Sequence, residues 1–318
     1  MDIVLTGSVA FDYLMKFPGY FRDHILADKL DSISLSFLVE SMVRRRGGIA
    51  PNIAYSLALL GGKPRVYASV GDDFEEYRHW LEKHGVDTSD MRVIPGEYTA
   101  SFFVNTDRSN AQIASFYPGA MAFADQLSLH DLTGDLPDLL VISPNDPKAM
   151  IRYAKECQEL DIPYLYDPSQ QIPRLEDNEL RSGVEGAYAL FVNDYEFGMI
   201  QKRIGMTPSD VLGSTELTVV TCGEEGSVIY TKEGDFHIPI VPPKEIVDPT
   251  GVGDAFRGGF LTGYGRGWDW ETCGRMGALA ATYCLECDGP QGHKYTREAF
   301  RERYRRHFDD RGVLDEII

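Results

Sequence analysis

The chain has 318 residues, of which 43% are hydrophobic. This length and apolar content suit one large α/β domain with an appendage, or two domains, with a core sizeable enough to fold alone. Its 49 acidic and 31 basic residues give a formal charge of −18 at pH 7, which opposes binding to nucleic acid or to an anionic membrane surface. The start of the sequence has no basic region and no long apolar run, so we expect no signal peptide, no membrane span and a cytoplasmic location.

The N-terminal residues predict a buried strand over 3–12 that ends in small and polar residues. Ligands of open α/β sheets bind beyond the carboxyl ends of such strands, so we expect Ser8 and Asp12 to face a site. An isolated aspartate would otherwise be an ordinary surface acid. Further along, serine alternates with apolar residues at 32–37, which predicts a short strand.

A glycine pair, Gly47-Gly48, precedes a predicted helix in which Pro51 suits the first turn and Gly61-Gly62 marks the end. Such a pair is commonly only a tight turn. The arginines at 44–46 are more typical of a solvated face than of a phosphate clamp, although one of them could shield transferring charge.

Two β-type segments, 99–104 and 111–117, flank a polar turn and predict a β-hairpin. Together with 32–37 they would form a small sheet over the main one, so that a lid is built from residues about 15–45 and 97–122. Phe102 and Phe116 would then either be buried in the lid or sandwich a flat base.

From residue 138 onward, strands alternate with helices, which predicts an α/β fold with a doubly wound, mainly parallel sheet flanked by helices. The chain shows no internal repeat and no linker, so we expect a single domain over 1–318 with the lid inserted in it. The expected strands are 139–142, 163–166, 189–192, 217–221, 227–230 and 235–238, and the expected helices are 147–160, 176–183, 208–213, 254–264 and 271–286.

Polar residues follow two of these strands. Gln170 and Gln171 come after strand 163–166, where their amides either hydrogen-bond a nucleobase or cap the turn. Asn193 and Glu196 follow strand 189–192, and their N-x-x-E spacing is too common to mean anything alone.

The most informative stretch is Asp248-Pro-Thr-Gly-Val-Gly-Asp254, a glycine-rich loop that leads into a helix. The amides of Gly251, Val252, Gly253 and Asp254 can converge on an anion there, and Asp254 could accept a proton from an attacking hydroxyl. The spacing is wrong for a dinucleotide fingerprint, and no lysine follows as in a Walker loop. The remaining alternative is an ordinary glycine-rich turn with an acid in the first turn of the helix.

This stretch resembles the signature of the ribokinase-like, or PfkB-type, sugar and nucleoside kinases, and further matches run from Gly7 to at least Gly289. The resemblance implies that Asp254 is the base and that Gly251, Val252 and Gly253 form the anion hole. It implies that Asp12, Gly48 and Asn52 contact sugar hydroxyls. It also implies an ATP site that includes Asn193, Thr221, Gly223 and Gly226, with Mg²⁺ handled by Glu196 through water.

Within this family, the segments at 8–12, 34–39, 112–121 and 167–171 resemble bacterial adenosine kinases more than ribokinase. We therefore expect ATP-dependent phosphorylation of the 5′-hydroxyl of adenosine, with Mg²⁺ required and activation by a monovalent cation left open. A sugar or sugar-phosphate kinase is the alternative, and a non-catalytic nucleoside-binding regulator is a further one. A small lid sheet with uncovered edges also predicts a homodimer formed through the lid.

Overall fold

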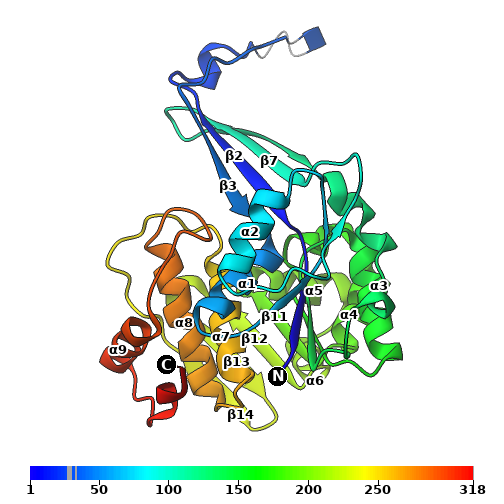
Figure 1. Cartoon of the computed structure of the whole chain (residues 1–318), viewed down its shortest axis with the longest axis vertical. Coiled ribbons are helices and arrows are strands. Elements are labelled where there is room, and N and C mark those ends of the chain that lie inside the picture. The colour runs from blue at the N-terminus through cyan, green and yellow to red at the C-terminus, as the bar shows by residue number, and fades with distance from the viewer. Residues whose placement is uncertain (27–30, 33, 318) are drawn as a thin grey trace.

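The computed structural model describes residues 1–26, 31–32 and 34–317 of the chain. Figure 1 shows an α/β body with a twisted β-sheet that rises from one end of it as a lid. No helix in the described part of the chain is both long and apolar enough to cross a membrane.

The body is built on an eight-stranded sheet of order β14-β13-β12-β11-β10-β9-β1-β4, parallel except that β13 pairs antiparallel with both β12 and β14. Its strands are β1 (Ile3–Thr6), β4 (Arg65–Tyr67), β9 (Leu139–Ile142), β10 (Tyr164–Tyr166), β11 (Ala189–Asn193), β12 (Leu217–Thr221), β13 (Ser227–Thr231) and β14 (Gly234–Ile238). The mainly parallel sheet flanked by helices that the sequence predicts is thus confirmed.

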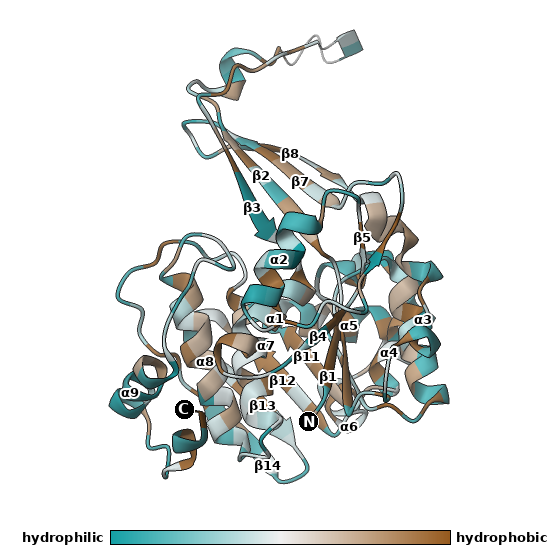
Figure 2. Ribbon diagram, in the orientation of Figure 1, coloured by the Kyte–Doolittle hydropathy of each residue, from teal (hydrophilic) through white to brown (hydrophobic). Residues whose placement is uncertain are grey.

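Helices cover both faces of this sheet because successive strand residues point to opposite sides. In β1, Ile3 and Leu5 join a buried cluster with α1 and α7, whereas Val4 joins one with α3, α4 and α5. Figure 2 shows the apolar strands at the centre and hydrophilic helices such as α9 outside. The helices are α1 (Ile49–Leu59), α2 (Glu75–Lys83), α3 (Pro147–Glu159), α4 (Asp177–Glu185), α5 (Asp194–Ile204), α6 (Pro208–Gly213), α7 (Val252–Tyr264), α8 (Trp270–Leu285) and α9 (Arg297–His307).

The lid is a four-stranded sheet of order β3-β2-β7-β8. Its strands are β2 (Ala10–Lys16), β3 (Ser41–Gly47), β7 (Ala100–Thr106) and β8 (Gln112–Tyr117). The predicted hairpin is confirmed as β7 and β8, which pair antiparallel. A two-stranded sheet of β5 (Ser69–Val70) and β6 (Arg92–Val93) lies in the connection before it.

Two predictions about the lid are wrong. The strand expected at 32–37 is not one at Ser32 or at 34–37, and Ile33 lies outside the described residues. Phe37 instead packs its ring against Phe17 and Phe21, whereas Leu35 is exposed.

The strand expected over 3–12 is likewise two strands in two different sheets. The body strand β1 ends at Thr6, and the Ser8 amide donates to the Pro144 carbonyl at 2.8 Å before the chain enters lid strand β2. Asp12 is therefore a lid residue.

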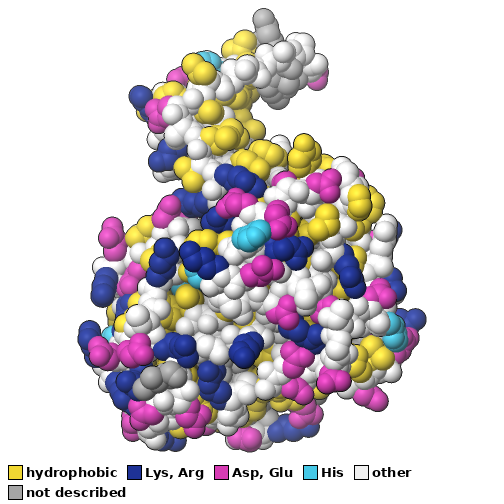
Figure 3. Space-filling view, viewed as in Figure 1, with side chains coloured by type: hydrophobic (Ala, Val, Ile, Leu, Met, Phe, Trp, Pro, Cys, Tyr) yellow, Lys and Arg dark blue, Asp and Glu magenta, His cyan; other side chains and the backbone are white. Residues whose placement is uncertain are grey.

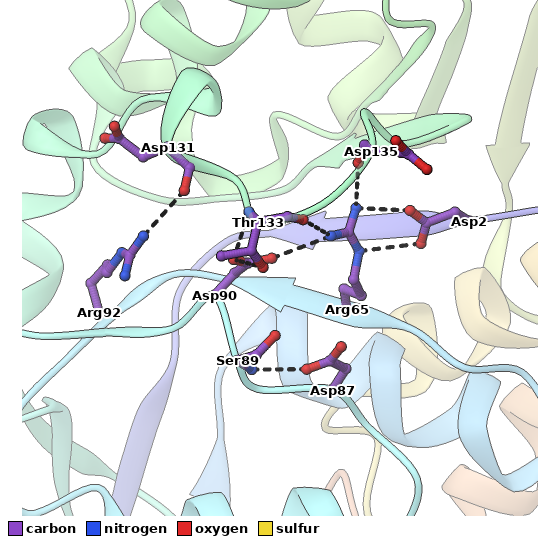
Figure 4. A network of polar contacts seen from close by, with 9 residues as sticks. All are labelled: Asp2, Arg65, Asp87, Ser89, Asp90, Arg92, Asp131, Thr133 and Asp135. Atoms are coloured by element: carbon purple, nitrogen blue, oxygen red, sulfur yellow. Dashed lines mark hydrogen bonds and ion pairs between the residues drawn. The ribbon is translucent and has the colours of Figure 1, made fainter.

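Arg65, the first residue of edge strand β4, is at the centre of a network of polar contacts that Figure 4 shows. Its guanidinium group donates to the Asp2 carboxylate at 2.7 Å, to the Thr133 carbonyl at 2.8 Å and to Asp90 at 3.4 Å. This network ties edge strand β4 to the start of β1 and to the loop before β9. The network lies at the amino ends of β1 and β4, so the carboxyl ends of these strands lie at the other end of the sheet.

Candidate active site

The carboxyl ends of the strands in the body sheet lie next to the lid, where β1 leads into β2 and where β3 leads into α1. The N-termini of α1 and α7 both lie at this edge, and the Asn52 and Asp254 side chains of their first turns are in contact. The sequence predicted these two segments separately, and the structure brings them together.

Helix α7 begins at Val252, two residues earlier than predicted, with Gly251 as its N-cap. Gly251 has a φ of 78°, and a Cβ atom there would collide with Pro290, so both backbone conformation and space require glycine. Because Gly251 has no side chain, it cannot cap the amides of the first helical turn. The Val252 amide makes only a long contact of 3.5 Å to the Pro249 carbonyl, and the helix dipole adds positive potential that favours an anion there.

Asp254 lies in this first turn and accepts a hydrogen bond from Asn52 Nδ2 at 2.9 Å. Burial raises its pKa to about 7, against the opposing effects of the Arg257 charge and the Asn52 hydrogen bond. A carboxylate with such a pKa is matched to proton transfer near neutral pH.

An ion pair one turn below Asp254 was not predicted from the sequence. Arg257 Nη2 donates to Asp167 Oδ1 at 2.8 Å, and its Nε lies 2.7 Å from Oδ2. Both residues are buried. Two features of the sequence could have indicated this ion pair. Arg257 follows Asp254 at i+3 on the same helix, and Asp167 lies at the end of β10.

Gly48 is the N-cap of α1 with a φ of 94°, and a Cβ atom there would lie 2.5 Å from the Ser8 carbonyl oxygen. Ser8 Oγ in turn accepts from the Ile49 amide at 3.3 Å. The segment between β1 and β2 is therefore packed directly against the start of α1. Asn52 follows one turn later and is buried.

One row of side chains crosses the lid on a single face, because paired residues of adjacent strands point to the same side. Register pairs Arg45 with Asp12, Asp12 with Phe102, and Phe102 with Phe116. Arg45 Nη1 donates to Asp248 at 3.0 Å and Nη2 pairs with Asp288. Because Asp248 lies in the loop that leads to α7, this face of the lid is turned toward α7.

Asp12, in the middle of the row, is partly buried. Burial raises its pKa to about 6, while Arg45 opposes the shift and Asp248 adds to it. Phe116 leaves 48% of its surface exposed, so the row offers a carboxyl group beside accessible aromatic surface.

The three arginines of β3 are partly solvated, as predicted, with Arg44 exposed, but each also makes specific contacts. Arg44 and Arg46 lie on the opposite face of the lid from Arg45, stack over the rings of Phe11 and Trp80, and pair with the same glutamate, Glu76 of α2. Cation–π contacts and ion pairs thus occupy all three guanidinium groups.

Other predicted residues lie at neighbouring strand ends. After β10, Gln170 is exposed and Gln171 is buried in a short 3-10 helix. Asn193 is the N-cap of α5, a helix that was not predicted from the sequence. It forms a reciprocal capping box with Glu196, with a hydrogen bond of 2.8 Å in each direction. The N-x-x-E spacing therefore has a structural role as well.

The loop after β12 holds the remaining predicted residues. Thr221 ends the strand, and Gly223 and Gly226 have φ values of 56° and 89°. A Cβ atom on Gly226 would collide with the Ile238 carbonyl oxygen, so this glycine is required by the close approach of β14. Within residues 1–26, 31–32 and 34–317, no group of three or more His, Cys, Asp or Glu side chains could hold a metal ion.

Comparison with known proteins identifies the class of protein. The chain is a phosphotransferase with an alcohol acceptor. Residues 12–296 match the pfkB family carbohydrate kinases, and the chain belongs to that family, which uses ATP, generally with Mg²⁺.

Two relatives align over nearly the whole chain. The structure of Burkholderia thailandensis nucleoside kinase in complex with inosine is 34% identical, with a TM-score of 0.84, covering 96% of this chain and 98% of that one. The nucleoside kinase of Methanocaldococcus jannaschii is 29% identical over 307 residues, 96% of this chain and 97% of its own length.

The adenosine kinase of Sinorhizobium meliloti is only 22% identical, with a TM-score of 0.73 and coverage of 96% and 99%, so it shows the shared fold alone. The expected likeness specifically to adenosine kinases is thus corrected to a likeness to nucleoside kinases.

Proposed function

We propose that this kinase transfers the γ-phosphoryl group of ATP to the 5′-hydroxyl of a nucleoside, with adenosine and inosine among its substrates. The observation that carries the proposal is the row on the lid. A sugar needs hydrogen-bonding groups such as Asp12, but only a nucleobase has a flat face to cover Phe102 and Phe116. The relatives that are named nucleoside kinases support the same assignment.

In this proposal Asp254 takes the proton of the attacking 5′-hydroxyl, and the first-turn amides of α7 stabilise the charge on the transferring phosphoryl group. Asp12 and Asn52 hold the ribose, with Gly48 giving the sugar close access to the backbone. Pairing of Arg45 with Asp248 and Asp288 holds the lid against the body and limits the entry of water.

ATP would lie along the strand ends of β11 and β12, where Asn193, Thr221, Gly223 and Gly226 are found. Mg²⁺ bound with the ATP phosphates keeps several waters and needs only one or two carboxylates, so the lack of a dedicated cage among the described residues is compatible with it. Glu196, a partly buried carboxylate near the Asp167–Arg257 pair, would hold it through water. Mg²⁺ would supply charge neutralisation of the phosphates.

The deciding experiment is ATP-dependent phosphate transfer to adenosine, inosine, cytidine, ribose and fructose 6-phosphate, with the position of the new phosphate ester located by NMR. We expect 5′-monophosphates and a kcat/KM for the best nucleoside at least about tenfold above that for ribose, or about 1.4 kcal/mol. Faster turnover of ribose would make the protein a sugar kinase. Nucleoside binding without ATP consumption would make it a regulator.

We also propose that two copies associate through their lids. Strand β8 is exposed along its whole length and forms an edge of the lid sheet. On the face opposite Asp12, Met42, Phe103, Ile113 and Tyr117 are exposed, and the apolar side chains on the lid are visible in Figure 3. Sedimentation equilibrium should give a dimer at micromolar concentration, and a monomer would rule this association out.

A further inference from the structure

A chain of side-chain hydrogen bonds connects α2 to the carboxylate of Asp254. Trp80 Nε1 donates to Gln291 Oε1 at 3.1 Å, Gln291 Nε2 donates to Asn52 Oδ1 at 2.9 Å, and Asn52 Nδ2 donates to Asp254 Oδ2 at 2.9 Å. Gln291 and Asn52 are both buried. Side chains from four segments, α2, the residues after α8, α1 and α7, thus meet in one line.

The donor-to-acceptor direction of these hydrogen bonds matters because the side-chain amides of Gln291 and Asn52 can each rotate by 180°. An Asn or Gln side chain presents a carbonyl oxygen on one side and an NH₂ group on the other, and a 180° rotation exchanges them without changing shape. In one orientation Asn52 donates to the Asp254 carboxylate. In the other its carbonyl oxygen would face the carboxylate, and contact would require a proton on Asp254.

Two groups fix Gln291 in the observed orientation. The indole N–H of Trp80 is a donor only, so it needs the carbonyl oxygen of Gln291. The Tyr77 hydroxyl donates its one proton to the Gly47 carbonyl at 3.0 Å, so its oxygen must accept, and it accepts from the Gln291 NH₂ group. Both constraints direct that NH₂ group toward Asn52.

We propose that Gln291 is a positioning residue, oriented by Trp80 and Tyr77, that forces Asn52 to present its NH₂ group to Asp254 and so keeps the base ready to accept a proton. The inference rests on the proposed role of Asp254. A buried unpaired acceptor is costly, so the fixed Gln291 donor strongly disfavours rotation of Asn52. Tyr77 also links this network to Gly47, the last residue of lid strand β3.

The environment of Asp254 shows why one donor matters. Its burial favours the protonated form, and only the Arg257 charge and the Asn52 hydrogen bond favour the ionised form. Arg257 is itself shared with Asp167. The titratable and charged groups that bear on this site from α7 and the surrounding segments are Arg257, Asp167, Glu196, Tyr77, Cys284, Asp12 and Asp248.

The test is the pH dependence of kcat/KM for inosine in Gln291→Met and Gln291→Glu. Methionine is uncharged and nearly isosteric with glutamine but donates no hydrogen bond to Asn52. The acidic limb of the kcat/KM profile should therefore move to higher pH. Glutamate accepts from Trp80 and draws the Asn52 NH₂ group toward itself, so the limb should move further, by about one pH unit or more. For a base with a pKa near 7, a shift of that size lowers kcat/KM at pH 7 about fivefold, with recovery above pH 8.

Trp80→Phe removes the indole donor and keeps an aromatic ring. The matched control is Trp268→Phe, because the Trp268 indole donates at 3.3 Å to exposed Glu316. Since Tyr77 still orients Gln291, Trp80→Phe alone should shift the limb little. Trp80→Phe combined with Tyr77→Phe frees Gln291 and should shift it by more than the sum of the single changes. Trp268→Phe should leave it in place.

An unmoved acidic limb in both Gln291 variants, with only a lowered melting temperature, would overturn the proposal and leave the network a structural one. If either Gln291 variant fails to unfold cooperatively, the Trp80 and Tyr77 double variant decides. Asp254→Asn is assayed beside them, because full turnover in that variant would refute the base itself rather than the role of Gln291.

Discussion

Replacing Phe116 with alanine should weaken nucleoside binding far more than it weakens the fold. The ring is 48% exposed, so its truncation removes only part of a side chain's buried area and should cost about 1 kcal/mol of stability or less. Stacking of a base on an aromatic ring is worth about 1–3 kcal/mol, which corresponds to about a 5- to 160-fold rise in Kd.

The matched control is Phe103→Ala. Phe103 lies on neighbouring strand β7, is 39% exposed, and points to the opposite face of the lid, where its ring stacks on Tyr13 at 4.7 Å. Calorimetric Kd values for adenosine and inosine, the KM for ribose, and thermal stability should be measured for both variants.

We expect the Phe116 variant alone to lose nucleoside affinity, with ribose unaffected. A nucleoside Kd within twofold of the parent, or an equal loss in the Phe103 variant, would refute the stacking argument and leave both rings as lid surface.

Three further predictions concern metal, pH and the lid. Glu196→Gln keeps an oxygen for the capping box but loses the charge, so the Mg²⁺ concentration for half-maximal rate should rise, and an unchanged titration would contradict this. Burial lowers the pKa of His293 to about 4. The unfolded state then binds more protons between pH 4 and 6.5, so unfolding free energy should fall by about 3 kcal/mol as pH drops through that window, and much less in His293→Gln. Arg45→Gln should raise the nucleoside KM by loosening the lid, whereas an unchanged KM would show that its pairs with Asp248 and Asp288 do not hold the lid closed.

The sequence predicted the body sheet well because its central strands, β1, β9, β10 and β11, are buried on both faces and form continuous apolar runs between glycine-rich or polar turns. The loop at 248–254 was predicted equally well, since a left-handed glycine before a helix and a first-turn acid are local features. Asn52 and Asp254 are 202 positions apart, and the family resemblance gave each a role without predicting the contact between them.

The lid was harder to predict. Strand β3 has the sequence Ser-Met-Val-Arg-Arg-Arg-Gly, which shows no alternation of apolar and polar residues. Its arginines are held in place by aromatic rings and acids, and the sequence pattern does not show these contacts. Residues 32–37 have that alternation in sequence, yet residues 34–37 form no strand. The Arg257–Asp167 pair and the placement of Gln291 depend on long-range packing, which no local pattern encodes.

The central claim is that Asp254 removes the proton from the nucleoside hydroxyl, and Asp254→Asn tests it most directly. The asparagine carbonyl can still accept from Asn52, so the geometry is retained while the base is lost. Single-turnover kinetics and calorimetry should show kcat for inosine lowered by about 10² or more, with the inosine Kd within a few-fold of the parent. A kcat that barely changes, with intact binding, would contradict the account.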